Sequence, residues 1–469
     1  MQTTDPTARL DRFLANPRRG MWGMALPMMA GMSLHTIYMI ADLIFVGMLG
    51  ARELEAVAFD MPLVFLGLGV TFGLGSGVTA VVARYVGARD AAGADRAAQN
   101  GLLMGLVLTA IFTVVGGLFG HELLASMGVP ADLLPIAWEF FGPIVYGYLF
   151  LVLSVFFRSI LAGEGDMRTP MMIQGASTLL NIALDPLFMF TFGLGVRGAA
   201  YATVLSQAAA ALTFVWMLYR RGRSYVRFDP RDFRPSARLL ADIARIGAPA
   251  SFSFLIIAVS SGFFNRLLIE YSPQVVAAYQ VGGRLDHVVM LPMISISTAL
   301  VAMVAMFRGA ERMDLVRDLV NYSMRWAIGI GAVMALFFYL LAPYMMRGFS
   351  DESAIVVAGI GYLHYIVWSY PFVAISMLAS RILQGLGIGS PSLILTVMRV
   401  ILVAAPLAWV LVYLFHTSVA GVWLAMLIGV VVTAVVSMIW LRVGLSRAER
   451  GALGLAGGAR ASVETVPVA

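Results

Sequence analysis

Apolar residues along this chain come in long runs that are separated by short polar segments. Twelve of these runs are long enough to cross about 30 Å of hydrocarbon as α-helices. They lie near residues 22–48, 58–83, 100–122, 134–158, 168–190, 196–219, 240–269, 276–306, 320–347, 354–384, 391–414 and 418–443. The short alternating segments typical of an outer-membrane barrel are absent. The pattern therefore predicts an all-α polytopic membrane protein with twelve transmembrane helices.

Arginine is distributed unevenly over the polar segments. The segments before the first run, after the second run, between the sixth and seventh runs and after the eighth run are rich in arginine. The central one carries seven, from Arg220 to Arg238, whereas the alternate segments carry one or none. Basic loops stay on the cytoplasmic side of a membrane. We therefore expect an inner (plasma) membrane protein with both termini and the central segment in the cytoplasm.

The same segments divide the chain into five parts. We expect a cytoplasmic N-terminal tail at 1–20, an N-lobe of six helices at 21–219, a cytoplasmic Arg-rich linker at 220–239, a C-lobe of six helices at 240–443 and a disordered cytoplasmic tail at 444–469. The first apolar run has no small-residue cleavage pattern and is too long for the apolar part of a signal peptide. It is therefore predicted to span the membrane.

The two halves of the chain resemble each other with a shift of about 222 residues. The matched pairs are Pro27 with Pro249, Ala56 with Ala278, Gly87 with Gly309, Gly163 with Gly385, Gly165 with Gly387 and, one residue further, Gly198 with Gly421. Because each half has an even number of spans, both halves enter the membrane from the same side. This is the pattern of a parallel repeat. It predicts two pseudo-symmetric six-helix lobes with a cavity between them.

Two carboxylates lie within apolar runs of the first half, Asp42 in "MIADLIFVG" and Asp185 in "NIALDPLF". A charge at the bilayer centre costs about 2.5–3.5 kcal/mol even on the lenient scales, so it normally faces the protein interior or water. Asn181 lies four residues before Asp185, on the same helical face. The repeat places uncharged residues, Phe264 and Pro406, opposite the two acids. Packing needs recur in both halves, whereas an ion site need exist only once, so we interpret the acids as functional rather than as satisfied structural groups.

Further candidate side chains share the face of the first run that carries Asp42. Tyr38 lies one turn before the acid. The others, at spacings of four and three residues, are Met28, Met32, His35 and Met39. Methionine is unbranched and polarizable, which suits a pocket for varied apolar substrates; an ordinary packing face explains the stripe equally well. A single histidine such as His35 is more often a hydrogen-bonding core residue than a proton relay.

Composition excludes several classes of function. Only 12% of the residues are charged, and the mean hydropathy is +0.87, against about 25% charged residues in soluble chains. The chain has neither cysteine nor lysine, which excludes disulfides, cysteine nucleophiles and P-loop or Schiff-base lysines. The motifs HExxH and GxSxG are also missing. We therefore expect a transporter rather than an enzyme, with no cofactor, no metal and no nucleic acid partner, driven by an ion gradient.

Four stretches together resemble the multidrug and toxic compound extrusion (MATE) family, and the similarity covers about residues 20–443. They are "IADLIFVGMLGARELEAVA", "YVGARD", "LAGEGDMRTP" and "NIALDPLFMFTFGLGVRGAAYATVLSQ". Twelve spans in two six-helix lobes are also the architecture of that family. The chain resembles the DinF-like prokaryotic branch in particular, whose protonation site lies in the N-lobe. The residues that fall on that branch's N-lobe acids and their polar neighbours are Asp42, Asp185, Tyr38, Asn181 and Thr203, and Pro27 falls on the proline where its first helix is thought to bend.

The resemblance implies a proton-coupled secondary antiporter that exports drugs or other amphipathic, often cationic compounds by alternating access, expected as a monomer in the lipid bilayer. Sodium is an alternative to protons, because two carboxylates with Asn and Thr oxygens suit either ion. NorM-type members carry acids in the seventh and tenth spans. This chain has no carboxylate within 247–264 or 355–380, so it lacks the acids of a sodium site of that kind in the C-lobe. A lipid or lipid-linked oligosaccharide flippase of the same fold ranks lower, because the deep arginines available for a pyrophosphate are Arg284 and Arg399, with Arg266 near the end of a span. Arg284 and Arg399 also suit a pairing with backbone carbonyls or with Asp286.

Overall fold

The computed structural model describes residues 6–221, 226 and 233–463, and this part of the chain is helical with no strand. The first half contains α1 (Pro6–Ala15), α2 (Pro17–Leu49), α3 (Ala51–Gly87), α4 (Ala91–Ser126), α5 (Leu134–Gly163), α6 (Arg168–Pro186), the π-helix η1 (Leu187–Thr191) and α7 (Gly195–Arg221). The second half contains α8 (Ala237–Leu268), α9 (Pro273–Gly309), α10 (Met313–Phe349), α11 (Ser353–Ile366), η3 (Val367–Ser369), α12 (Tyr370–Gly385), α13 (Ser390–Val397), the π-helix η4 (Met398–Ala404), α14 (Ala405–Tyr413) and α15 (Ala420–Val463).

Twelve helical segments cross the length of the two lobes. Eleven of them, among the described residues, are long and apolar enough to span a membrane. Two of these are compound, because α11, η3 and α12 form one segment, as do α13, η4 and α14. The twelfth is α6 with η1, whose polar residues lower its mean hydropathy. The prediction of an all-α protein with twelve transmembrane helices is confirmed.

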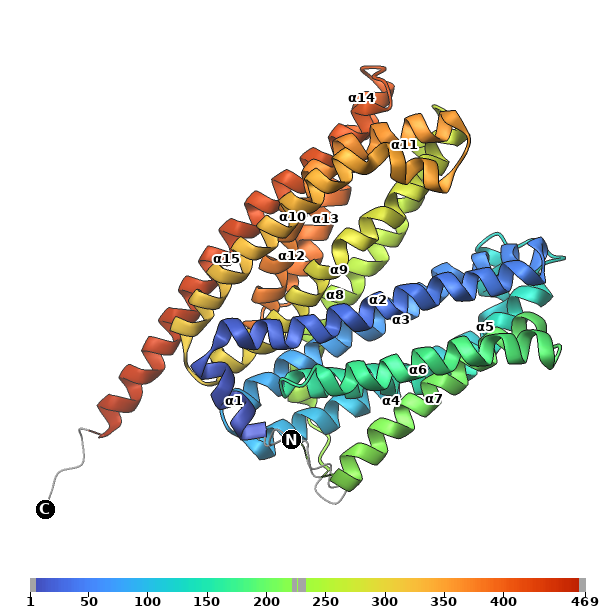
Figure 1. Ribbon diagram of the computed structural model, residues 1–469. Helices are drawn as coiled ribbons and strands as arrows, with labels where there is room; N and C mark the ends of the chain where they lie inside the picture. The colour runs from blue at the N-terminus through green and yellow to red at the C-terminus, as the bar shows by residue number, and fades with distance from the viewer. Residues whose placement is uncertain (1–5, 222–225, 227–232, 464–469) are drawn as a thin grey trace, which may run out of the picture.

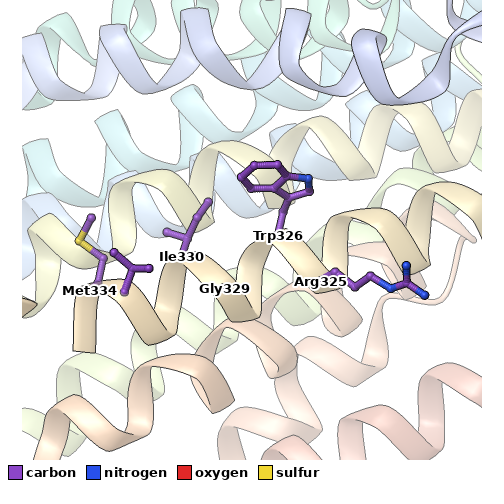
Figure 2. Close-up of a pocket in the computed structure, with 6 residues that line it drawn as sticks. Arg325, Trp326, Gly329, Ile330 and Met334 are labelled. Atoms are coloured by element: carbon purple, nitrogen blue, oxygen red, sulfur yellow. The ribbon is translucent and has the colours of Figure 1, made fainter. Parts of the chain in front are cut away.

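Figure 1 shows α2 to α7 as one bundle and α8 to α15 as a second. The bundles lie together at the end that carries both termini, here called the terminal face, and diverge toward the opposite end, here called the distal face. Side chains join the lobes in the half near the terminal face. Gln384 donates to the hydroxyl of Ser76 at 2.8 Å, and Trp22 donates to the hydroxyl of Tyr322 at 3.1 Å. The ring of Trp22 also lies edge-on to that of Trp326, whose centroid is 5.5 Å away, on the part of α10 drawn in Figure 2.

The packing between the lobes shows the repeat directly. A Cβ atom on Gly87 would overlap the backbone carbonyl of Met306, and one on Gly309 would overlap the backbone carbonyl of Arg84. Arg84 and Met306 are themselves related by the shift of about 222 residues. The two contacts are therefore one contact repeated by a pseudo-two-fold axis, which passes between the lobes at this point. The predicted pair of pseudo-symmetric lobes is confirmed.

The turns repeat in the same way. Arg89 and Glu311, at equivalent positions after α3 and α9, both have a left-handed backbone, with φ of 56° and 58°. Gly165 and Gly387, after α5 and α12, have φ of 79° and 80°. Glycine accepts this backbone conformation without the cost that a Cβ imposes. The glycines that the two halves share are therefore explained by turns and by close helix contacts.

The ends of the chain differ from the sequence-based expectation. Residues 6–15 of the expected N-terminal tail form α1, because Leu10 and Phe13 share one face and are both buried against the bundle. The tail expected to be disordered from residue 444 continues α15 as a helix through Val463, in a stretch without proline. α8 begins at Ala237, inside the expected linker at 220–239. Residues 1–5, 222–225, 227–232 and 464–469 lie outside the described part of the chain, so the expectations for them stay predictions.

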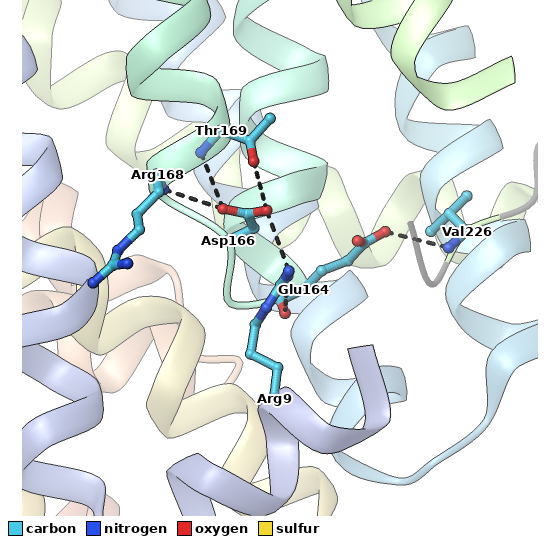
Figure 3. Close-up of polar contacts among 6 residues, drawn as sticks. All are labelled: Arg9, Glu164, Asp166, Arg168, Thr169 and Val226. Atoms are coloured by element: carbon cyan, nitrogen blue, oxygen red, sulfur yellow. Dashed lines mark hydrogen bonds and ion pairs between the residues drawn. The ribbon is translucent and has the colours of Figure 1, made fainter. Parts of the chain in front are cut away.

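The "LAGEGDMRTP" stretch forms a polar turn on the terminal face (Figure 3). Asp166 accepts hydrogen bonds from the first two backbone N–H groups of α6, both at 3.1 Å, and from the hydroxyl of Thr169 at 2.9 Å. Arg9 of α1 donates to Asp166 at 3.3 Å and to the carbonyl of Glu164 at 3.4 Å. The carboxylate of Glu164 accepts from the backbone N–H of Val226 at 3.2 Å. One turn thus ties α1, the start of α6 and the linker together.

We expect Asp166→Ala to destabilise the protein by about 0.5–2 kcal/mol, the usual cost of a lost N-terminal helix cap. The variant also leaves Arg9 without its carboxylate. Thermal unfolding in detergent measures the effect as a lower midpoint temperature. Asp132→Ala is the matched control, since its ion pair with Arg52 is exposed and such pairs contribute little. Equal midpoints for the two variants would contradict the role given to this turn.

Candidate functional site

The polar residues of the N-lobe lie near one depth, in the half of the lobe away from the terminal face. Asp42 precedes the distal end of α2 at Leu49, and Thr203 follows the distal start of α7 at Gly195. At about 1.5 Å per residue, the two lie about 10–12 Å from those helix ends. Asp185 lies near the end of α6, just before η1 turns toward α7. Three helices therefore bring their polar residues to one level.

Two hydrogen bonds connect the residues of this site. The hydroxyl groups of Tyr38 and Thr203 lie 3.5 Å apart, joining α2 to α7. The side-chain amide of Asn181 donates to Asp185 at 3.3 Å, within α6. The carboxyl groups of Asp42 and Asp185 lie close enough for their charges to act on each other. The structure thus brings together the two acids and the three polar neighbours that the family resemblance implied.

A small cavity of about 20 Å³ lies among these helices. Its walls include Tyr38, Asn181 and Thr203, and also His35, whose ring centroid is 5.5 Å from that of Tyr38. The remaining walls are polar side chains of α6 and α7. This volume holds about one water molecule, so the cavity suits a proton carrier or a small ion and is too small for a drug.

Both acids of the site have unused hydrogen-bonding capacity. One oxygen of Asp42, one oxygen of Asp185 and the amide oxygen of Asn181 are buried with no hydrogen-bond partner. Leaving such a group unsatisfied costs about 1–3 kcal/mol. The free atoms are all oxygens, which accept a proton on the carboxylates and also suit a hard cation such as Na⁺. No cluster of three or more His, Cys, Asp or Glu side chains that suits a multivalent metal ion occurs in the described ranges.

The three methionines of α2 that share a face with Asp42 lie in two different environments. Met28 is buried, and Met32 accepts a weak hydrogen bond from the hydroxyl of Ser295 on α9 at 3.8 Å. Met39, further toward the distal face, is 41% exposed. α2 passes through Pro27 as one continuous helix. The first two methionines therefore lie where the lobes touch, and Met39 lies where they diverge.

Asp60 on α3 is a third acid of the N-lobe that sequence reasoning missed. It is fully buried, and neither carboxylate oxygen has a hydrogen-bond partner. In the sequence, Asp60 lies two residues after the start of the predicted span at 58–83. An acid at that position is typical of an ordinary helix end. α3 begins earlier, at Ala51, so Asp60 lies more than two turns inside the helix. Extending the apolar run backward through "LEAVAF" would have revealed it.

We expect Asp60→Leu to stabilise the protein by about 1–3 kcal/mol, the typical cost of burying a polar group without a partner. Leucine has a similar size and no polar atoms. A higher midpoint of thermal unfolding in detergent is the expected result. Asp286→Leu is the contrasting variant, since its carboxylate has two partners, and it should be less stable than the parent. A lower midpoint for Asp60→Leu would show that Asp60 has a stabilising partner.

The C-lobe holds its own acid, in a different setting. Asp286 on α9 accepts hydrogen bonds from the hydroxyls of Tyr362 at 2.5 Å and Tyr370 at 2.7 Å. The expected pairing of Asp286 with Arg284 or Arg399 is wrong, because among the described residues Asp286 forms no ion pair with either arginine and binds the two phenols instead. Both oxygens of Asp286 thus have partners, whereas Asp42 and Asp185 each keep one oxygen without a partner, which is the arrangement that suits the exchange of a cation.

Comparisons with known proteins agree with this architecture. Residues 27–187 and 249–410, one stretch in each lobe, match the MatE family. The chain is 26% identical to the multidrug export protein MepA of Staphylococcus aureus, over 90% of this chain and 92% of that protein. It is also 26% identical to an FAD transporter of Shewanella oneidensis, over 83% and 87% of the two chains. A crystal structure of MATE in the bent conformation superposes with a TM-score of 0.90 at 30% identity, covering 96% of this chain and all of that one.

Proposed function

The chain belongs to the MatE family of membrane transporters, and we propose that it is a proton-coupled secondary antiporter that exports amphipathic, often cationic drugs. The observation that carries the proposal is the pair of N-lobe acids, Asp42 and Asp185, each with one buried oxygen free. Such oxygens accept protons without breaking an existing hydrogen bond. The similarity to MepA, a multidrug export protein, supports the class of substrate.

The proposed orientation puts both termini in the cytoplasm of a cell whose inner membrane holds the protein. It rests on the arginine-rich segments next to the terminal face and on the rule that basic loops stay inside. The lobes diverge toward the distal face (Figure 1), so in this orientation the end at which the lobes lie further apart is the outer one. Protons then reach Asp42 and Asp185 from the exterior.

Transport proceeds by alternating access between the two lobes. Protons from outside neutralise Asp42 and Asp185, which removes negative charge from the N-lobe. A cationic substrate loses its electrostatic partner and leaves outward, while α2 rearranges near Pro27. The lobes then rock about their contact, the acids give up their protons to the cytoplasm, and the restored charge binds a new cation. Each state thus holds either protons or substrate.

Sodium is the second candidate for the coupling ion. The free oxygen of Asn181 beside the two carboxylates favours it, because Na⁺ binds oxygen ligands and a proton needs no amide oxygen. A sodium-coupled exporter would use the same residues and the same cycle. The two ions therefore differ in which gradient drives the export.

Purified protein in vesicles, with either a pH gradient or a sodium gradient imposed, separates these proposals. We expect a pH gradient alone to drive accumulation of a fluorescent cation such as ethidium, and a sodium gradient alone to drive none. Export driven by a sodium gradient alone would show that the coupling ion is Na⁺ rather than a proton. FAD is a useful second substrate, since one relative is a transporter of this anion. Transport of FAD and not of ethidium would overturn the proposed substrate class.

A further inference from the structure

A groove with a cavity of about 390 Å³ runs along α10, far from the acids of the N-lobe. It is lined by Arg325, Trp326, Gly329, Ile330, Val333 and Met334. Figure 2 shows Trp326, Ile330 and Met334 projecting from one side of the helix, with Arg325 at one end. The groove is therefore an apolar trough that ends at a cation.

The groove begins at the seam where α10 of the C-lobe meets α2 of the N-lobe. Trp22 on α2 contacts Trp326 edge-to-face and donates to the hydroxyl of Tyr322. One turn closer to the terminal face, Arg18 binds Asp318 at 2.7 Å. A molecule in the groove would lie beside the contacts that hold the two lobes together.

The residues that line the groove are exposed or partly exposed at the surface of the protein. Val333 is 64% exposed and Trp326 is 47% exposed. A Cβ atom built on Gly329 would meet no atom within 4 Å. Because α10 is a membrane span, an uncovered apolar surface on it faces hydrocarbon chains rather than water. The occupant of the trough must therefore be an amphiphile of the bilayer.

The charge at the end of the trough selects the kind of amphiphile. Arg325 is exposed and makes no ion pair within the described part of the chain; its charge acts on Asp318 from a distance, while Arg18 binds both oxygens of that carboxylate. It lies about 18 Å along α10 from Met313, at about 1.5 Å per residue. From there an arginine side chain can extend to the headgroup region, where guanidinium groups bind phosphate in two-pronged geometry. An organic cation would be repelled.

We propose that the groove on α10, which begins beside the contact of α10 with α2, is a binding site for one anionic phospholipid. Its phosphate pairs with Arg325, and an acyl chain lies along Gly329, Ile330 and Met334. Since the site adjoins the Trp22 contact between the lobes, the bound lipid stabilises the arrangement in which the lobes meet at the terminal face. The site is separate from the acids and binds a molecule that is not transported.

Native mass spectrometry of the purified full chain, titrated with phosphatidylglycerol or with zwitterionic phosphatidylcholine, tests the proposal. We expect one tightly bound phosphatidylglycerol on the parent. Arg325→Gln should weaken it by about tenfold or more, the value of a lost charge-assisted hydrogen bond. Gly329→Leu, which fills the trough without a backbone clash, should abolish it. Binding of phosphatidylglycerol should also raise the midpoint of thermal unfolding of the parent and not of Arg325→Gln.

Two variants on the same helix serve as controls. Arg347→Gln removes an exposed arginine outside the groove, and Gly348→Leu adds a side chain where Gly348 also has open space. Both should bind phosphatidylglycerol as the parent does. Equal affinity of the parent for the two lipids, unchanged binding by Arg325→Gln, or displacement of the lipid by ethidium would each overturn the proposal. The last outcome would make the groove a substrate site.

Discussion

Asp42→Asn should give a folded protein that no longer couples export to a proton gradient. Asparagine keeps the size of the side chain and removes the group that takes up and releases a proton. A gradient of one pH unit is worth about 1.4 kcal/mol per proton, or about a tenfold ratio of substrate across the membrane. The variant should lose that tenfold accumulation in vesicles with an imposed pH gradient. The measurement is ethidium accumulation against gradient size, for the parent and the variant at equal protein density.

The control for this experiment is the same substitution in the other lobe. Asp286→Asn also replaces an intramembrane acid, one whose oxygens are held by Tyr362 and Tyr370. Accumulation by this variant should still respond to the pH gradient. Parent-like accumulation by Asp42→Asn, or loss of the gradient response in Asp286→Asn alone, would move the coupling site out of the N-lobe.

Gly87→Val and Gly309→Val should each drive the lobes apart at the terminal face. In both cases the new Cβ atom would overlap a backbone carbonyl of the other lobe, and backbone cannot turn aside as a side chain can. Overpacking of this kind costs about 1–3 kcal/mol, enough to shift the balance between two lobe arrangements by about fivefold to about a hundredfold. Because one pseudo-symmetric contact is disturbed from either side, the two variants should have equal effects.

Spin labels on the distal face measure this rearrangement. The chain has no native cysteine, so Ser126→Cys on α4 and Ser353→Cys on α11 provide one label in each lobe. We expect the distance between the labels to shorten or its distribution to broaden in both glycine variants. Gly47→Val, at a position with open space around it, should leave the distribution as in the parent. A change in one glycine variant and none in the other would contradict the pseudo-symmetric pivot.

Much of the fold follows from features that membrane physics imposes on the sequence. The twelve apolar runs and the paired glycines, such as Gly87 and Gly309, predicted the spans and the repeat, because hydrocarbon requires long apolar helices and close helix contacts require glycine. Asp42 and Asp185 were identifiable for the same reason, since an acid inside an apolar run is costly. Their association with Thr203 came from the family resemblance, because nothing in the local pattern of α7 marks that residue.

Other features depend on tertiary contacts that a linear pattern does not contain. The burial of Asp60 was not predicted, because it depends on the start of α3 at Ala51, several residues before the apolar run at 58–83. The partners of Asp286 come from α11 and α12, far away in sequence, so an arginine two residues away looked equally suitable. α1 forms because Leu10 and Phe13 find a buried surface on the bundle, whereas ten residues that carry three charges and are too few to span a membrane predict a tail on their own.

In the proposed cycle, protons and a cationic substrate exclude each other at Asp42 and Asp185. Adding ethidium to purified protein in weakly buffered detergent solution, with a pH indicator dye, measures this exclusion. We expect substrate binding by the parent to release protons into the solution. An Asp42→Asn, Asp185→Asn double variant should release none. Binding of ethidium to the parent without proton release, or equal release from the double variant, would show that protons and substrate do not compete at these two acids.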